Sequence, residues 1–78
     1  MKLALAIARE LKAIRIRKDL RMEDVANDND MALETLRRYE KNAGKVNIET
    51  LDKILSYYNV DKSIFFATVC EYNHEKEE

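Results

Sequence analysis

The 78-residue chain lacks proline and tryptophan altogether and has a single glycine and a single cysteine. The near-absence of glycine and proline argues against a disordered chain and against two domains joined by a flexible linker. Cys70 has no second cysteine to pair with, so an internal disulfide is excluded, as is usual for a protein of the reducing cytoplasm. No apolar run reaches the roughly 20 residues that a membrane-spanning helix needs.

The composition favours one small helical domain. Apolar residues make up 46% of the chain and charged residues 37%, and a chain of this length has room for one domain with a modest core. We therefore expect an all-α globule that forms a single domain over residues 1–78, with its core within residues 3–72 and a frayed acidic tail over residues 73–78. The apolar run near the amino terminus is too short for a signal peptide and continues into charged residues, so we interpret it as mature sequence.

The charge of the chain is nearly balanced overall but uneven along its length. Net charge is −1 and the isoelectric point is about 5.9, which does not indicate a nucleic-acid-binding protein. Residues 9–21 contain six basic and two acidic side chains, residues 23–34 contain five acidic and none basic, and residues 37–45 contain four basic and one acidic. Such blocks are compatible with a phosphate-binding face on an acidic molecule, and equally with an ordinary solvated surface.

The most informative local pattern lies in residues 22–40. Val25 and Ala26 fall on one face of a short helix, and Leu36 and Tyr39, three residues apart, share a face of a second one. The polar residues between the two segments suit a tight reversal of the chain. This arrangement is typical of a helix-turn-helix.

Further helices are predicted around this pattern. A first helix over residues 2–18 has apolar residues at spacings of four, four and three, and Gly44 in the left-handed conformation would end the helix over residues 32–41. A fourth helix would follow Asn47 as its cap, and a fifth would follow Asp61. The apolar stripes are Leu3, Ile7, Leu11 and Ile14 in the first helix and Ile48, Leu51, Ile54 and Leu55 in the fourth.

The predicted fifth helix carries more apolar bulk than a terminal helix of a small core needs. Two interpretations are open: the surplus closes the bottom of the core, or it forms an interface between two copies of the chain. Leu5 and Ile16, which lie off the apolar stripe of the first helix, similarly hint at a partner surface. The residues of the possible dimer interface are Phe65, Phe66, Val69 and Tyr72.

Motifs along most of the chain match one known family without an insertion. They are Leu11-x-x-Ile14-Arg15, Leu20, Val25-Ala26, Met31, Leu36, Tyr39-Glu40, Asn47-Ile48-Glu49-Thr50-Leu51 and Tyr58-Asn59-Val60. On these residues, the chain from Leu11 to Phe66 resembles the phage-repressor or Cro-type helix-turn-helix domain, also called the xenobiotic-response-element-like family. The resemblance implies a compact five-helix lambda-repressor-like fold that binds double-stranded DNA.

The resemblance also implies roles for individual residues. Arg15 and Glu40 would form an ion pair that ties the helix-turn-helix to the scaffold, and removing one half of a buried pair costs about 3–5 kcal/mol. Two unrelated surface charges are the alternative. In the major groove, Arg38 would bind O6 and N7 of a guanine, Glu34 would accept from a cytosine amine, and Leu33 would pack on a thymine methyl. The side chains implied to lie near phosphates are Thr35, Arg37, Lys41, Asn42 and Lys45.

Three positions depart from the family pattern. Asp30 stands where a small residue, most often glycine, is usual, and Met22 stands where a glutamine usually contacts the DNA backbone. Ala32 replaces the serine or threonine that would cap the recognition helix, a loss of about 1 kcal/mol. Met22 removes a phosphate contact, and the acidic residues Glu23, Asp24, Asp28 and Asp30 would lie near the DNA backbone and weaken binding.

Three functional hypotheses follow. The first is a sequence-specific, repressor-like transcriptional regulator in the cytoplasm that reads an inverted-repeat operator as a homodimer through the helix over residues 32–41. The second keeps the fold and changes the partner: an adaptor or antirepressor whose acidic face binds another protein. The third is a structural oligomerising module.

Enzymatic chemistry is not expected. The sequence contains no recognisable nucleophile–base pair, glycine-rich phosphate loop or carboxylate dyad. We likewise expect no cofactor, no metal site, no membrane association and no small-molecule substrate. His74, the single histidine, is expected to be solvated in the tail, and Cys70 is expected to be a buried, inert thiol with a subunit contact as the alternative.

Overall fold

The computed structural model describes residues 1–74, and the side chains of residues 1–72. This part of the chain consists of five α-helices and one 3-10 turn, which confirms the expected all-α, five-helix fold. The tail expected from residue 73 begins inside the last helix, and residues 75–78 lie outside the described part. The elements are α1 (Leu3–Arg17), α2 (Met22–Asp28), α3 (Leu33–Lys41), the 3-10 turn η1 (Ala43–Lys45), α4 (Ile48–Tyr58) and α5 (Lys62–His74).

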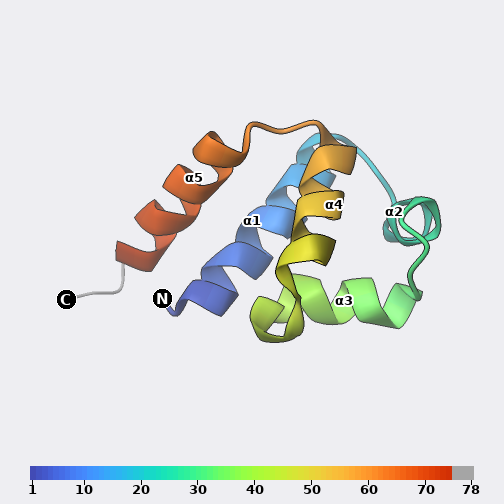
Figure 1. Ribbon diagram of the computed structural model, residues 1–78, viewed down its shortest axis with the longest axis horizontal. Coiled ribbons are helices and arrows are strands. Elements are labelled where there is room, and N and C mark those ends of the chain that lie inside the picture. Colours follow the sequence, from blue (N-terminus) through green and yellow to red (C-terminus); the bar gives the residue numbers. More distant parts are fainter. Residues whose placement is uncertain (75–78) are drawn as a thin grey trace.

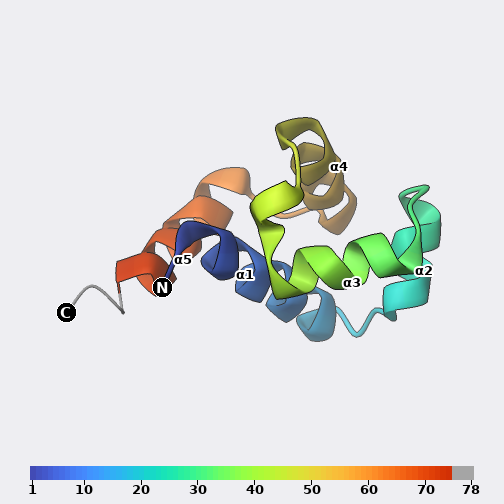
Figure 2. The ribbon, with the colours of Figure 1, turned by 90° about the horizontal axis from the view of Figure 1, so that it is seen from below.

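The central element is α1 (Figure 1). It packs against α5 on one side and against α3 and η1 on another. Because α5 runs antiparallel to α1, the start of α1 and the end of α5 lie at the same end of the molecule, as Figure 2 also shows. α2 packs on α3 toward the opposite end. The helix-turn-helix formed by α2 and α3 is therefore carried at one end of a scaffold made by the other helices.

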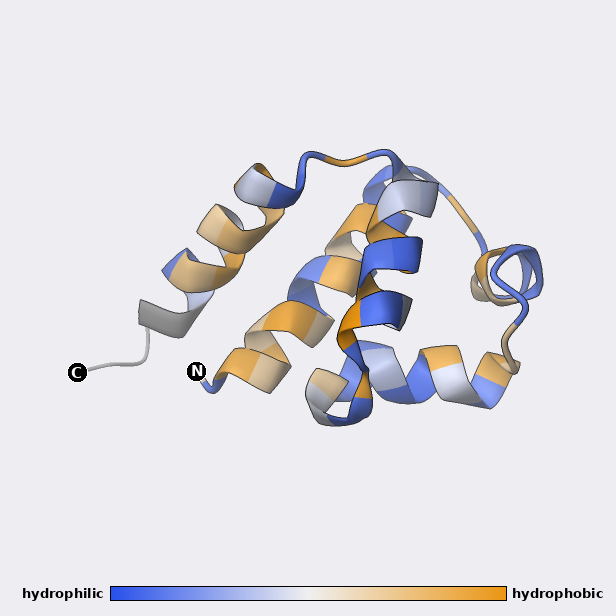
Figure 3. Ribbon diagram, in the orientation of Figure 1, coloured by the Kyte–Doolittle hydropathy of each residue, from blue (hydrophilic) through white to orange (hydrophobic). Residues whose placement is uncertain are grey.

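The core is shared by all five α-helices. Figure 3 shows apolar residues recurring along α1, α4 and α5. Because each helix contributes at least one fully buried large side chain, tertiary packing rather than local propensity holds the short helices in place. These side chains are Leu11, Val25, Leu36, Ile54, Leu55, Tyr58 and Val69.

Helix boundaries agree closely with the sequence-based expectation, but the apolar stripes are not buried throughout. In α1, Leu11 and Ile14 are buried, whereas Leu3 is exposed and the charged Glu10 is buried instead. In α4, Ile48 is 78% exposed, so the prediction that it joins the core was wrong. Leu3 and Ile48 are the first residues of their helices.

Both predicted amino-terminal caps are present. The Asn47 side chain accepts a hydrogen bond from the backbone N–H of Thr50 at 2.7 Å. The Asp61 carboxylate accepts one from the backbone N–H of Ile64 at 3.1 Å. These bonds satisfy amide groups that the first turn of a helix leaves without partners, which explains why α4 and α5 begin where they do.

The left-handed backbone conformation occurs at other residues than predicted. Gly44 does not adopt it; Gly44 lies in η1 and donates its N–H to Asn42 Oδ1 at 2.8 Å. Asp19, Asp30 and Asn59 instead have φ of 57°. Each follows a helix, where a left-handed residue lets the chain turn while the last carbonyls stay hydrogen-bonded. Asp and Asn tolerate this conformation better than most side chains, but less well than glycine.

Candidate nucleic-acid interface

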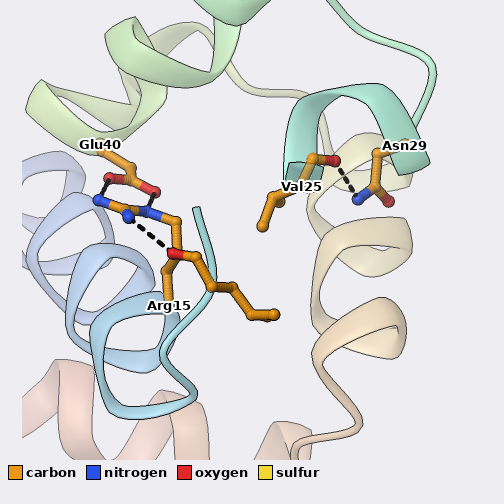
Figure 4. Close-up of polar contacts among 5 residues, drawn as sticks. Arg15, Val25, Asn29 and Glu40 are labelled. Carbon is orange, nitrogen blue, oxygen red and sulfur yellow. Dashed lines mark hydrogen bonds and ion pairs between the residues drawn. The ribbon is translucent and has the colours of Figure 1, made fainter. Parts of the chain in front are cut away.

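Arg15 of α1 and Glu40 of α3 form a two-pronged ion pair, as the resemblance implied (Figure 4). Arg15 Nε donates to Glu40 Oε2 at 2.8 Å and Nη2 donates to Oε1 at 3.0 Å. Arg15 Nη1 donates to the carbonyl of Leu20 at 3.0 Å. The side chains are 13% and 3% exposed, and the hydrogen bond from Glu40 raises the pKa of Arg15. This pair fastens the end of α3 to α1.

A buried asparagine holds the turn between α2 and α3. Asn29 Nδ2 donates to the carbonyl of Val25 at 2.8 Å (Figure 4). The N–H of Met31 donates to the carbonyl of Ala26 at 3.0 Å, and Asp30 between these bonds takes the left-handed conformation. From the sequence alone, Asn29 is indistinguishable from the solvent-facing polar residues beside it.

α3 turns a polar face to solvent. Leu36 is buried beneath this helix, whereas Glu34 and Arg38 are exposed and Leu33 is half-buried. The three residues that the resemblance assigns to base reading are therefore not enclosed by this chain. An α-helix presented in this way fits the width of a DNA major groove.

The outer face of α3 is mostly cationic. Glu34, Arg37, Arg38 and Lys41 line a surface hollow of about 260 Å³. Arg37 Nη1 donates to Glu34 Oε2 at 2.5 Å, which makes an ion pair within the helix. Three cations against one carboxylate give this face a positive charge that the balanced composition of the chain does not reveal.

The other residues expected near phosphates lie close to this face. Lys45 is exposed in η1, and Thr35 is half-buried in α3. Asn42 is exposed, but its side-chain oxygen already accepts a hydrogen bond from the N–H of Gly44. Its amide nitrogen is therefore the part of Asn42 suited to an anion.

Acidic side chains gather on α2 and the turn after it. Asp24 forms an exposed pair with Arg21 at 3.4 Å. Asp28 accepts a hydrogen bond from the hydroxyl of Tyr57 in α4 at 2.6 Å, and this bond raises the pKa of Tyr57. Asp30 is exposed. The helix-turn-helix thus combines a basic α3 with an acidic α2.

Two of the departures from the family pattern have visible structural counterparts. Ala32 stands before α3 and makes no side-chain cap, so the first turn of α3 lacks that hydrogen bond. Met22, half-buried, packs against the core at the start of α2 rather than offering a polar group. Met22 therefore offers no polar group to a phosphate, and the missing cap at Ala32 lowers the stability of the first turn of α3.

The four residues expected at a dimer interface differ in their exposure to solvent. Phe65 and Val69 are buried within the chain, so they have no surface to offer a second copy. Tyr72 is half-buried. Phe66 is exposed, and with Ile48 it borders an apolar hollow of about 120 Å³ between α4 and α5.

A buried carboxylate joins α1 to α5. Glu10 accepts a hydrogen bond from the hydroxyl of Tyr72 at 2.9 Å and another from Arg17 at 3.0 Å. The Arg9 guanidinium lies 4.2 Å from the centre of the Tyr72 ring, and the bond to Glu10 raises the pKa of Tyr72. By helical spacing Glu10 lies three residues after Ile7 and four before Ile14, on the apolar side of α1. Its burial was missed because a charged side chain is rarely buried.

Cys70 is exposed, so the prediction of a buried thiol was wrong. The side of α5 that meets the core carries Phe65 and Val69, and Cys70, one residue beyond Val69, points to another side because successive helical residues are about 100° apart. The side chain of His74 lies outside the described part of the chain.

No helix in residues 1–74 is both long and apolar enough to cross a membrane. Within the same residues, no three side chains of the metal-binding types His, Cys, Asp and Glu are grouped so that they could hold an ion.

Comparison with known proteins bears on both the sequence and the fold. The sequence model of a family described as helix-turn-helix matches residues 11–65. A solved structure of a point mutant of the restriction-modification controller protein C.Esp1396I is 21% identical, covers 99% of this chain and 100% of that chain, and has a TM-score of 0.87. Another mutant of that protein, in a trigonal crystal form, is 23% identical, covers 88% and 92% respectively, and has a TM-score of 0.80. No curated protein matches the sequence significantly.

Proposed function

We propose that this chain, which belongs to the helix-turn-helix family, is a DNA-binding transcriptional regulator that reads an inverted-repeat operator as a homodimer. The observation that carries the proposal is the open, basic outer face of α3, bordered by Glu34, Arg38 and Lys41. The Arg15–Glu40 pair joins α3 to α1, so α3 is already folded and in place before it enters a DNA groove. No catalytic role is proposed for any residue.

Base reading is assigned to three residues of α3. Arg38 is exposed and bears the guanidinium that pairs with O6 and N7 of guanine. Glu34 accepts from the amino group of cytosine, and Leu33, at the first turn, packs on a thymine methyl. The register of the protein on DNA is set by phosphate contacts from Thr35, Arg37, Lys41, Asn42 and Lys45.

The dimer is proposed to form through the exposed apolar surface of α4 and α5. Phe66 and Ile48 border the hollow there, and Lys62 at its rim pairs with Asp52 at 3.1 Å, leaving the floor apolar. Two-fold pairing matches one patch with itself. It places two copies of α3 in successive major grooves about 34 Å apart, which requires an inverted repeat.

A selection of binding sites from random DNA at low salt tests the proposal, followed by titration of the selected site and of fragments from the native locus. We expect Arg38→Ala to abolish discrimination between sequences, because it removes a base contact. Lys45→Ala should weaken binding to all sequences alike, because it removes a phosphate contact. The proposal fails if neither selection nor the native locus yields a bound sequence at low salt.

The likeness to a restriction-modification controller protein suggests one setting for this regulator. C.Esp1396I is described as such a controller, and we propose that the present chain acts on the DNA upstream of its own gene. Retardation of the chain's own upstream DNA, and of no other fragment of similar length, is the expected result.

A second function is favoured by the acidic side chains of α2. Exposed Asp30 and Glu23 lie beside the face that would meet DNA, and each acid near a phosphate weakens binding. In this alternative the helix-turn-helix serves as an adaptor whose acidic side binds a basic protein. Purification from the native cell distinguishes the two: operator DNA recovered with the chain supports regulation, and a stoichiometric basic protein without DNA supports the adaptor.

A further inference from the structure

Arg37 and Glu34 form a fixed couple on the outer face of α3. They lie three residues apart and therefore on the same side of the helix, and Arg37 Nη1 donates to Glu34 Oε2 at 2.5 Å. The Arg37 side chain is 42% exposed and that of Glu34 is 80% exposed. The Arg37 side chain is therefore the more enclosed of the two, and the Glu34 carboxylate extends into solvent beside it.

The pairing changes how Glu34 behaves toward DNA. A free carboxylate on this face would be repelled by the phosphates, and the guanidinium of Arg37 cancels that charge. An exposed pair of this kind contributes little in water. Contact with DNA displaces water, and the attraction between the two charges grows as the surrounding dielectric constant falls.

The hydrogen bond also orients the carboxylate. Oε2 is occupied by Arg37, while an ionised carboxylate has a second oxygen that accepts hydrogen bonds. The N4 amino group of cytosine is a matching donor in the major groove. We propose that Arg37 is a specificity-determining positioning residue: it holds Glu34 so that the second oxygen selects cytosine. This inference rests on the function proposed above and gives Arg37 a role beyond contact with a phosphate.

The test measures discrimination between bases separately from overall affinity. The selected operator, and operators changed at one base pair at a time beneath α3, are titrated with the wild-type chain and with Arg37→Ala, Arg37→Lys, Glu34→Gln and the double variant Arg37→Ala/Glu34→Gln. Lys45→Ala is the control for loss of a phosphate contact. Circular dichroism verifies that each variant is folded, and Arg37→Lys keeps a cation three residues from Glu34.

If Arg37 acts through Glu34, Arg37→Ala lowers the preference for cytosine at one base pair about tenfold. Arg37→Lys loses less of that preference than Arg37→Ala does, because it keeps a cation. Glu34→Gln removes the same preference, and adding Arg37→Ala to it changes discrimination no further. The inference is overturned if Arg37→Ala weakens all operators equally and lowers the salt dependence by about one phosphate, as Lys45→Ala does. It is also overturned if Glu34→Gln leaves the preference intact. A wild-type chain without sequence preference overturns the proposed function as well, so the two failures are distinguishable.

Discussion

The hydroxyl of Tyr72 donates to Glu10 Oε1 at 2.9 Å and so joins α5 to α1 through a carboxylate that is nearly enclosed by the chain. Arg17 donates to the other oxygen of the same carboxylate at 3.0 Å. A buried carboxylate is tolerated when its oxygens are hydrogen-bonded. These two donors therefore allow an acidic residue to lie where α1 and α5 pack together.

Tyr72→Phe is expected to lower the free energy of unfolding by about 1 kcal/mol, because it removes one donor to Glu10 and leaves the ring in place. Urea denaturation measures the change. Glu10→Gln should cost more than Tyr72→Phe, since it weakens both bonds and leaves Arg17 without its carboxylate. Equal stability of wild type and Tyr72→Phe would mean that the hydroxyl contributes nothing to docking of α5.

Glu40→Ala is expected to destabilise the chain by about 3 kcal/mol, because the Arg15 guanidinium would then be left largely covered and without its carboxylate. The matched control is Glu34→Ala, which removes a carboxylate from an exposed pair on the same helix and should cost under about 1 kcal/mol. Thermal melts followed by circular dichroism compare the two. Equal losses would argue that enclosure of the Arg15–Glu40 pair has no energetic consequence.

Asp30→Gly is expected to stabilise the chain modestly, by under about 1 kcal/mol, because glycine adopts positive φ without steric cost but also gains freedom when unfolded. It should also tighten DNA binding at low salt, since one acidic charge is lost. Asp30→Asn is the control: it removes the charge and keeps a side chain that tolerates this backbone. If both variants tighten DNA binding and only Asp30→Gly adds stability, the effect of the charge is separated from that of the backbone. Unchanged DNA binding in both variants would contradict a location of Asp30 near phosphates.

Tyr58→Phe is expected to leave the free energy of unfolding unchanged at neutral pH, or to raise it by about 1 kcal/mol. The Tyr58 hydroxyl is buried and makes no hydrogen bond to any residue of the described chain, and a buried polar group without a partner is unfavourable. Urea denaturation at pH 7 provides the measurement. A loss above about 1 kcal/mol would show that the hydroxyl has a partner in solution, such as an internal water.

Alkaline pH is expected to unfold the chain, and Tyr58 should dominate the effect. Burial raises the pKa of Tyr58 strongly, and hydrogen bonds to carboxylates raise the pKa of Tyr57 and of Tyr72. The folded chain therefore holds these phenolic protons more tightly than the unfolded chain. Stability from this source is fully present below about pH 10, the ordinary tyrosine value, and is lost as pH rises through the folded-state values. Melting temperatures between about pH 8 and 11 should fall less steeply for Tyr58→Phe than for wild type; identical slopes would contradict the assignment.

The helix positions and the scaffold ion pair were predictable because they depend on local or family-wide signals. Asn47 and Asp61 cap their helices through bonds to residues three positions on, which a sequence reveals directly. The burial of particular side chains was less predictable. Periodicity identifies the apolar side of a helix but not how far neighbouring helices extend over it, so Ile48 was misplaced. Cys70 was wrongly assigned to the apolar side of α5, because it directly follows Val69 and points to another side.

The sequence predicted which side of α3 faces solvent, but not the contacts among the side chains on that side. The spacing of Leu36 and Tyr39 fixed the inner side of α3, and the outer side followed from it. An exposed arginine can make many contacts other than one with a glutamate three residues away, so spacing alone does not predict the bond between Arg37 and Glu34. The burial of Glu10 was missed because its partner Tyr72 is distant in sequence, and that of Asn29 because it stands in a run of polar residues whose other members are exposed.

The ion pair between Glu40 of α3 and Arg15 of α1 makes the shape of α3 depend on the folded scaffold. α3 has nine residues, and an isolated peptide of that length is not helical in water. The reading surface therefore exists only while the scaffold is folded, and operator occupancy and the folded fraction should decline together as temperature rises. Under the proposed function, bound DNA would stabilise the folded chain, so heating should release the operator above the melting temperature of the free protein, without an inducer.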